Sequence, residues 1–185
     1  MSDITVEDTH ISGVQVLTRT LRADERGFLE RLFDGTQLQP VLAGRRVEQI
    51  NRTKTLKAGT VRGLHLQLSP FEELKIVSCL RGSVFDVAVD LRPQSQTFGT
   101  WFGCELTSDN RCALVIPEGC AHGVQALEDD CDLLYVHTAP YTAESERGLN
   151  PLDPNVAIAW PMAPTGLSAR DVSLPPLPQW KRGSS

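Results

Sequence analysis

The stretch KIVSCLRGSVFDVAVDLR, residues 75–92, carries the clearest strand signal in the chain. Apolar runs on both sides of Leu80-Arg81-Gly82-Ser83 predict two strands joined by a turn. One face of the second strand would hold Phe85, Val87, Val89 and Leu91. The other face would hold Asp86 and Asp90, and an aspartate there is more often a charge on the sheet surface than the partner of another group. The stretch therefore predicts paired antiparallel strands.

Further short strands extend from this pair toward both ends of the chain. The pattern predicts them at residues 14–21, 28–33, 47–55, 61–68, 100–106, 112–116, 122–127 and 131–138. About ten short strands with turn residues between them, and no long helical period, predict an antiparallel sandwich or barrel. We therefore expect an all-β jelly roll, with its core at about residues 13–138 and a C-terminal loop and tail at 139–185. In that tail, Ile158 and Trp160 could pack against the core, and Ser168 could cap a helical turn.

Length and composition limit the classes of protein to consider. A chain of 185 residues with 41% hydrophobic content can form one domain with a real core, which we expect to span residues 1–185. The formal charge of -5 argues against nucleic-acid binding. The chain has no apolar run long enough to span a bilayer and no signal pattern, which predicts a cytoplasmic protein. Its five cysteines form no C-x-x-C pair and are expected to be free, inert thiols.

The stretch TVRGLHLQLSPFEELK, residues 60–75, holds several chemically capable side chains. Strand alternation would aim His65 at a cavity and the leucines at the opposite face. After the turn at Ser69-Pro70, Lys75 would lie on the neighbouring strand of a hairpin. A neutral imidazole beside an ammonium can remove a carbon-bound proton and stabilise the enolate. Arg62 should point away from His65, unless Gly63 makes a bulge or Arg62 serves a second surface such as a dimer partner's pocket.

The loop PEGCAHG, residues 117–123, delivers His122 at the start of a strand. A P-x-G-x-x-H loop of this kind is familiar from cupin barrels, many of which bind a metal. A metal-dependent cupin would normally add two closely spaced histidines and a carboxylate upstream, but Gln67 occupies the next inward position after His65. We therefore expect no metal and no other cofactor. A metal-dependent cupin oxygenase or isomerase is the first alternative.

A later strand places Leu133, Tyr135 and His137 on one face. A strand tyrosine is most often a core aromatic with a satisfied hydroxyl, and His137 competes with Tyr135 for any acid–base role. Inverting a carbon beside a carbonyl requires a base on one face, a proton donor on the other and a cation near the oxygen. His65, Tyr135 and Lys75 are side chains of the right types.

Eight motifs occur in one order over nearly the whole chain: DERGFLE, QINRTKT, VRGLHLQ, ELKIVSCLRGSVFDVAVDLRPQSQTFG, IPEGCAHG, LLYVHTAPY, LDPNVAIAWP and LSARD. In these motifs the chain resembles the dTDP-4-dehydrorhamnose 3,5-epimerase (RmlC-type) family. The resemblance implies a metal-free cupin jelly roll, usually a homodimer with strands exchanged across the interface. It also implies an isomerase that inverts C3, C5 or both in a nucleotide-linked 4-keto-6-deoxysugar, through an enolate.

The resemblance also implies roles for individual residues. His65 would be the base, Asp171 the carboxylate that orients it, Lys75 the group that stabilises the enolate, and Tyr135 the acid on the opposite face. The diphosphate would be held by Arg26 and Arg62, and the rest of the sugar and nucleotide pocket would be lined by Gln49, Asn51 and His122. Without the resemblance, Asp171 would be interpreted as a helix cap or a solvated charge, and Arg26 as a solvated loop charge.

The chain departs from the family pattern around the nucleotide and sugar, at Leu29, Arg31, Glu73, Val124 and Pro140. Glu73 stands where the rhamnose-pathway enzymes usually have glutamine. These departures leave open which nucleotide and sugar are used, which final sugar is made, and whether C3, C5 or both are inverted. A non-catalytic cupin that binds a sugar nucleotide is the second alternative.

Overall fold

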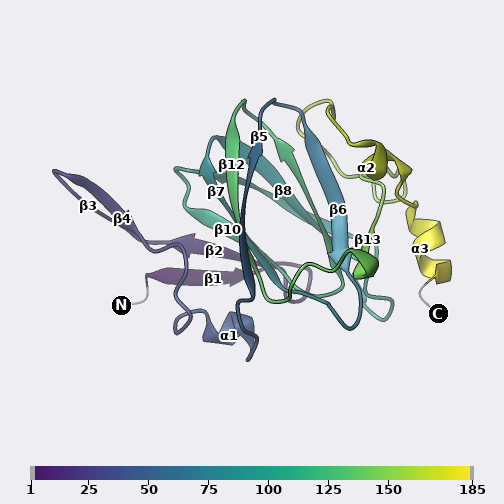
Figure 1. The fold of residues 1–185 in the computed structure, drawn as a ribbon, viewed down its shortest axis with the longest axis horizontal. Coiled ribbons are helices and arrows are strands. Elements are labelled where there is room, and N and C mark those ends of the chain that lie inside the picture. The colour runs from purple at the N-terminus through teal and green to yellow at the C-terminus, as the bar shows by residue number, and fades with distance from the viewer. Residues whose placement is uncertain (1–2, 184–185) are drawn as a thin grey trace.

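The computed structural model describes residues 3–183, which form two antiparallel sheets packed face to face (Figure 1). The first sheet has six strands in the order β1 (Ile4–Asp8), β2 (Gln15–Arg19), β10 (Cys112–Ile116), β7 (Lys75–Arg81), β12 (Cys131–His137) and β5 (Gln49–Thr55). The second has five, in the order β13 (Glu146–Gly148), β6 (Val61–Gln67), β11 (Cys120–Ala126), β8 (Ser83–Asp90) and β9 (Trp101–Thr107). The expected all-β jelly roll is confirmed.

A separate two-stranded arm, β3 (Leu21–Asp24) and β4 (Gly27–Glu30), projects from the end of the sandwich where β1 and β2 lie (Figure 1). The helical elements are short: α1 (Gln39–Leu42), the 3₁₀ turn η1 (Ala143–Ser145), α2 (Ala169–Ser173) and α3 (Leu177–Gly183). None of the helices formed by residues 3–183 is both long and apolar enough to cross a membrane.

The turn at Gly82 joins the two sheets instead of closing a hairpin. β7 pairs with β10 and β12, whereas β8 pairs with β11 and β9, so the expected pairing within residues 75–92 is wrong. Gly82 has φ +80°, and a Cβ there would lie 2.8 Å from Cys131 Sγ, so the corner has no room for a side chain. The expected hairpin between residues 61–68 and Lys75 is wrong for the same reason, because β6 and β7 also lie in different sheets. The alternation of side chains along a strand predicts which face of the sheet a residue occupies. It does not predict which other strand that strand pairs with.

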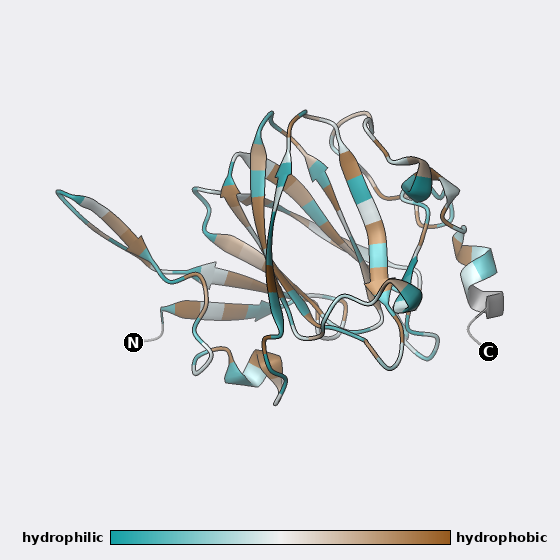
Figure 2. Ribbon diagram, viewed as in Figure 1, coloured by the Kyte–Doolittle hydropathy of each residue, from teal (hydrophilic) through white to brown (hydrophobic). Residues whose placement is uncertain are grey.

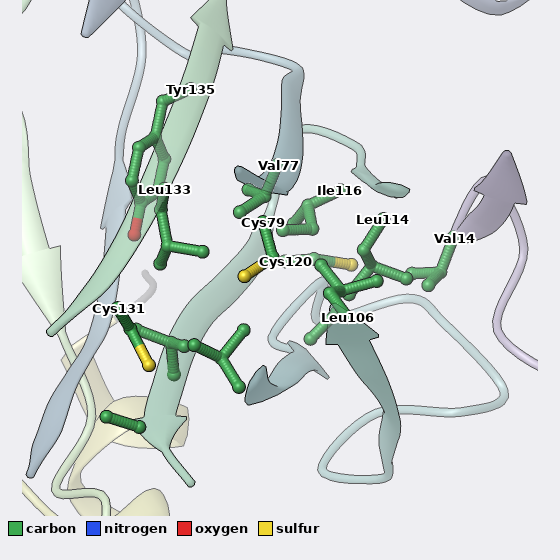
Figure 3. Close-up of a cluster of buried hydrophobic side chains, with 14 of the residues drawn as sticks. Val14, Val77, Cys79, Leu106, Leu114, Ile116, Cys120, Cys131, Leu133 and Tyr135 are labelled. Atoms are coloured by element: carbon green, nitrogen blue, oxygen red, sulfur yellow. The ribbon is translucent and has the colours of Figure 1, made fainter. Parts of the chain in front are cut away.

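The main core fills the space between the sheets (Figure 3). It includes Val77, Leu114 and Leu133 from the six-stranded sheet, and Val84 and Leu106 from the five-stranded sheet. In Figure 2 apolar and polar residues alternate along many of the strands, as expected when each face of a sheet has a different environment. The inward-facing side chains thus account for the packing of the sandwich.

A second core covers the outer face of the five-stranded sheet. There Val87, Val89 and Leu91 pack with the C-terminal segment, including Ile158 and Trp160 as expected. Trp160 Nε1 also donates to Pro151 O at 2.9 Å. Because apolar groups cover both faces of β8, its two aspartates are fully buried, and the expected surface location for them is wrong.

The chain termini extend both sheets beyond the expected core. β1 precedes residue 13 and pairs with β2, whereas β13 follows residue 138 and pairs with β6. Residues 139–185 were expected to form a loop and tail with a helical turn, so the edge strand β13 is a correction. The helical turn at Ser168 is confirmed, because Ser168 Oγ accepts a hydrogen bond from Asp171 N at 3.0 Å and caps α2.

Candidate active site

A cavity of about 390 Å³ is lined by strands of both sheets and by α2. Seven of the nine expected site residues line it: His65, Lys75, Tyr135, Asp171, Asn51, Arg62 and His122. The other two, Gln49 and Arg26, are outside its lining. Five different strands and one helix thus bring together side chains that lie up to 120 positions apart, from Asn51 to Asp171.

His65 and Asp171 form a close pair at the wall of the cavity. His65 Nε2 lies 2.7 Å from Asp171 Oδ1, and the Asp171 carboxylate is almost completely buried. Burial lowers the pKa of His65; Asp171 acts in the opposite direction, and the net pKa lies below the ordinary value. The imidazole is therefore neutral at pH 7. With Nε2–H donated to Asp171, Nδ1 keeps the lone pair, as a general base requires.

Lys75 reaches the same cavity from the opposite sheet. Its ammonium lies 3.2 Å from Glu73 Oε1 and donates to His65 O at 3.4 Å. Burial raises the pKa of Glu73, but the hydrogen bond from His137 and the charge of Lys75 outweigh burial, and the net pKa is lowered. Glu73 is therefore a carboxylate. The expected closeness of His65 and Lys75 is right, although it arises across the sandwich.

Tyr135 lies between two histidine rings. The His122 ring meets it edge-on, with centroids 5.7 Å apart, and the His137 ring is stacked on it at 5.9 Å with an interplanar angle of 14°. Tyr135 belongs to the buried core and also lines the cavity (Figure 3). Burial raises the pKa of its hydroxyl, and the nearby charge of Asp86 adds to the effect. The phenol therefore keeps its proton at neutral pH.

A bulge at Gly63 brings Arg62 into this cavity. The β6–β11 pairing joins His65 to His122 but Arg62 to Val124, so β6 holds one extra residue. Gly63 has φ +120°, and a Cβ there would lie 2.6 Å from Gly123 Cα. Arg62 Nε donates to Thr55 Oγ1 at 3.1 Å. Of the two explanations that alternation left open for Arg62, the bulge is the one found within this chain.

Gln49 and Arg26 occupy different surroundings. Gln49 Nε2 donates to Asn51 Oδ1 at 3.0 Å, so Gln49 contacts a residue that lines the cavity. Arg26 lies in the turn of the β3–β4 arm, with 82% of its side chain exposed and its guanidinium paired with Asp24. The arm points away from the sandwich (Figure 1). Within one chain, Arg26 is therefore not part of the cavity.

Two pairs of bonded side chains in the site were not predicted from the sequence. Asp86 accepts from His122 Nε2 at 3.0 Å, and Glu73 Oε2 lies 2.7 Å from His137 Nδ1. Alternation had placed Asp86 on the opposite face from Phe85. Its burial follows from the six-stranded sheet that packs over that face. Of the five departures from the family pattern, Glu73 and Val124 line the cavity and the rest do not. Across residues 3–183, no group of three or more histidine, cysteine or acidic side chains could hold a metal ion.

Comparison with known proteins connects this geometry to a family. The family model described as dTDP-4-dehydrorhamnose 3,5-epimerase matches residues 8–179. The chain belongs to this epimerase family. It is an isomerase with the RmlC-type cupin fold and acts on a dTDP-4-keto-6-deoxysugar in deoxysugar biosynthesis, as a 3,5- or a 3-epimerase. The family, fold and reaction class expected from the motifs are confirmed.

Individual relatives support the assignment over almost the full length. The dTDP-4-dehydrorhamnose 3,5-epimerase of Sinorhizobium fredii (strain NBRC 101917 / NGR234) is 39% identical, with 96% of this chain and 91% of that protein covered. The dTDP-4-dehydrorhamnose 3-epimerase of Streptomyces niveus is 40% identical, with coverage of 87% and 78%.

Two solved structures of epimerases have the same fold. The 3,5-epimerase of Legionella pneumophila Philadelphia 1, in complex with dTDP-4-keto-L-rhamnose, is 37% identical with a TM-score of 0.89, and coverage is 95% of this chain and 93% of that one. A 4-keto-6-deoxy sugar epimerase from the novobiocin biosynthetic gene cluster of Streptomyces spheroides is 35% identical with a TM-score of 0.93, and coverage is 98% and 92%.

Proposed function

We propose that this epimerase uses His65 to remove a proton from a carbon next to the C4 ketone of its substrate. The observation that carries the proposal is the His65–Asp171 pair, which lines one cavity together with Lys75 and Tyr135. The neutral imidazole is a base whose tautomer is set by a buried carboxylate. No other histidine that lines this cavity contacts Asp171.

The proposed reaction accounts for each proton and each electron pair that moves. His65 Nδ1 takes the proton, and the electron pair of the C–H bond moves onto the C4 oxygen to form an enolate. The Lys75 ammonium stabilises that negative charge. Tyr135 then gives its hydroxyl proton to the opposite face of the same carbon and restores the ketone with inverted configuration. Solvent returns a proton to the phenolate and removes one from His65.

The diphosphate would bind to Arg62, because a guanidinium offers two parallel N–H groups to phosphate oxygens. Asn51 on β5 and His122 on β11 would contact the sugar and nucleotide from the two different sheets. His122 is held by the fully buried Asp86, so its ring has a defined orientation for such a contact.

Proton exchange with solvent tests the proposed function directly. Incubation of the wild-type protein with dTDP-4-keto-6-deoxyglucose in heavy water should place deuterium at C3, at C5 or at both, as counted by mass spectrometry and NMR. The carbons labelled identify the centres that the site handles. Binding of the nucleotide sugar with no deuterium uptake would contradict the proposal and favour a non-catalytic binding protein.

Tyr135→Phe should separate abstraction from inversion. The variant keeps the aromatic ring but loses the proton donor, so we expect exchange at one carbon to persist while inversion falls by about 10²-fold or more. The measurement is the ratio of inverted to deuterated product. Tyr141→Phe is the comparison within the same cavity, because it removes the hydroxyl of the chain's other tyrosine, which also lines the cavity and is bonded to Glu146. Equal inversion by Tyr135→Phe and the wild type would rule out the acid role.

We also propose a homodimer in which the β3–β4 arm of one protomer reaches the cavity of the other. The arm exposes Phe28 and Leu29, at 70% and 60%, and Ile50 on the edge strand β5 is 58% exposed. Such apolar groups favour burial in an interface. Arg26 would then add a second guanidinium to the partner's diphosphate site.

Mixed dimers test whether Arg26 acts across the interface. Arg26→Ala and His65→Ala should each impair turnover in pure dimers, Arg26→Ala through about a tenfold rise in KM. A mixed dimer would have one site with an intact His65 and the other protomer's intact Arg26, so activity should return when the two variants are refolded together. Sedimentation should show a dimer throughout. No recovery in mixed dimers would contradict action across the interface.

We propose a cytoplasmic location from the state of the cysteines. All five are free, and burial raises the pKa of Cys79, Cys104 and Cys120 to about 12. Such thiols are unreactive at pH 7, and free thiols are typical of a reducing compartment. Recovery of the protein from a secreted fraction would contradict this location.

A further inference from the structure

The Glu73–His137 pair lies in the candidate active site but has no step in the proposed reaction. Both side chains are almost buried, at 7% and 14% exposed, and both line the cavity. His137 is the group that alternation made the rival of Tyr135 as the proton donor. Its protonation state therefore decides which of the two side chains can act as an acid.

A directed chain of hydrogen bonds reaches His137 from the backbone of Tyr141. A backbone N–H can only donate, so Tyr141 N–H donates to Gln49 Oε1 at 3.2 Å. The amide nitrogen of Gln49 then donates to Asn51 Oδ1 at 3.0 Å. This leaves Asn51 Nδ2, which is also a donor, to face His137 Nε2 at 3.4 Å.

This orientation of the two amides favours one tautomer of His137. Since Nε2 faces a donor, it must carry a lone pair, and the ring proton is on Nδ1, where it is donated to Glu73 Oε2 at 2.7 Å. A second proton on Nε2 would point at the Asn51 amide N–H groups. To remove that conflict both amides would have to turn, and Gln49 would then face the Tyr141 N–H with its own N–H groups.

The Glu73–His137 pair contacts two groups of the proposed reaction. Glu73 Oε1 lies 3.2 Å from the Lys75 ammonium, and the His137 ring is stacked on Tyr135. The charged groups near His137 are therefore Glu73 itself and Lys75 beyond it, with the Tyr135 phenol across the stack. The Glu73–His137 pair thus connects the proposed cation and the proposed acid.

We propose that Gln49, Asn51 and Glu73 hold His137 as a neutral positioning residue, so that Tyr135 and not His137 supplies the second proton. The inference rests on the proposed function for its catalytic meaning. It gives Gln49 and Asn51 a role beyond the substrate contacts expected of them, and it assigns a purpose to the carboxylate of Glu73. His137 fixes the Tyr135 ring by stacking and Glu73 by its hydrogen bond.

The tautomer can be tested without activity by ¹⁵N NMR of the histidine rings at pH 7.5. We expect His137 in the wild type to be protonated on Nδ1 alone. In Gln49→Glu, the carboxylate can only accept, so Asn51 must turn its N–H groups toward residue 49 and its oxygen toward His137. His137 Nε2 should then gain a proton. Asn51→Asp should have the same effect, because its second oxygen would face Nε2.

Gln39→Glu is the control for the added charge, because Gln39 is exposed at the start of α1, away from the cavity. Its His137 signals should match the wild type. An Nε2 proton in the wild type, or an unprotonated Nε2 in both Gln49→Glu and Asn51→Asp, would overturn the inference. Two variants are used because either alone could disturb the fold.

Activity then tests what His137 does for Tyr135. His137→Ala should lower the ratio of inversion to deuterium exchange by about tenfold, and His137→Phe, which keeps a ring on Tyr135, should recover most of that loss. If His137→Phe loses inversion as completely as Tyr135→Phe, the imidazole itself is the donor and the inference is wrong. Failure of the wild type to exchange protons would reject the proposed function instead, and the NMR result would still stand by itself.

Discussion

His65→Ala is expected to lower proton exchange at the substrate carbons by about 10²- to 10⁴-fold, the contribution that a well-placed general base makes. The imidazole is bonded to the Asp171 carboxylate, and alanine offers no atom that accepts a proton. Binding of dTDP should stay within a few-fold, because the diphosphate contacts assigned to Arg62 are untouched. Deuterium uptake and dTDP titration are the two measurements.

His10→Ala is the matched control for this variant, since His10 is exposed and its ring makes a T-shaped contact with the ring of Phe102. It should exchange protons as the wild type does. His65→Ala also leaves the buried Asp171 without its partner, so His65→Gln, which can still donate to that carboxylate, separates lost chemistry from lost stability. Exchange at the wild-type rate in both His65 variants would reject His65 as the base.

Lys75→Met is expected to reduce exchange by about 10²- to 10³-fold, the range found when one donor to a developing negative charge is removed. The enolate oxygen would then form its charge beside the Glu73 carboxylate with no ammonium between them. The loss should appear in kcat, because the cation matters more to the enolate than to the neutral ketone. Steady-state kinetics of exchange give kcat and KM separately.

Lys54→Met provides the comparison, because Lys54 lies on β5 and is partly exposed beside Asp130. Lys75→Arg keeps the positive charge and should retain part of the activity if charge is what matters. A rise in KM with unchanged kcat in Lys75→Met would mean that Lys75 only binds substrate, which contradicts the enolate role.

The sequence was sufficient for the fold class and for the face on which many side chains lie. The two-residue period of a strand assigned Asp86 and Val87 to opposite faces correctly. It could not assign strand partners, because pairing depends on segments distant in the chain. Gly82 was correctly identified as a turn, but whether such a turn closes a hairpin or crosses between sheets depends on the strands with which β7 and β8 pair, which come later in the chain.

The types of residue in the candidate site could be predicted from the sequence better than their arrangement in space. Alternation brought His65 to a cavity, but nothing local to residue 171 indicates that its carboxylate bonds a histidine 106 positions away. Only the resemblance to a family of epimerases suggested that contact. Arg26 is the opposite case. Its motif matches the family, but its position on the β3–β4 arm keeps it outside the cavity of its own chain.

The helix α2, which carries Asp171, follows β13, the last strand of either sheet. During synthesis, a chain that has emerged only as far as β13 could already assemble both sheets, including the strand that holds His65. Its imidazole would have no carboxylate to select which nitrogen bears the proton. Under the role proposed for His65, the capacity to remove a proton from the sugar would therefore arise only once α2 has been made.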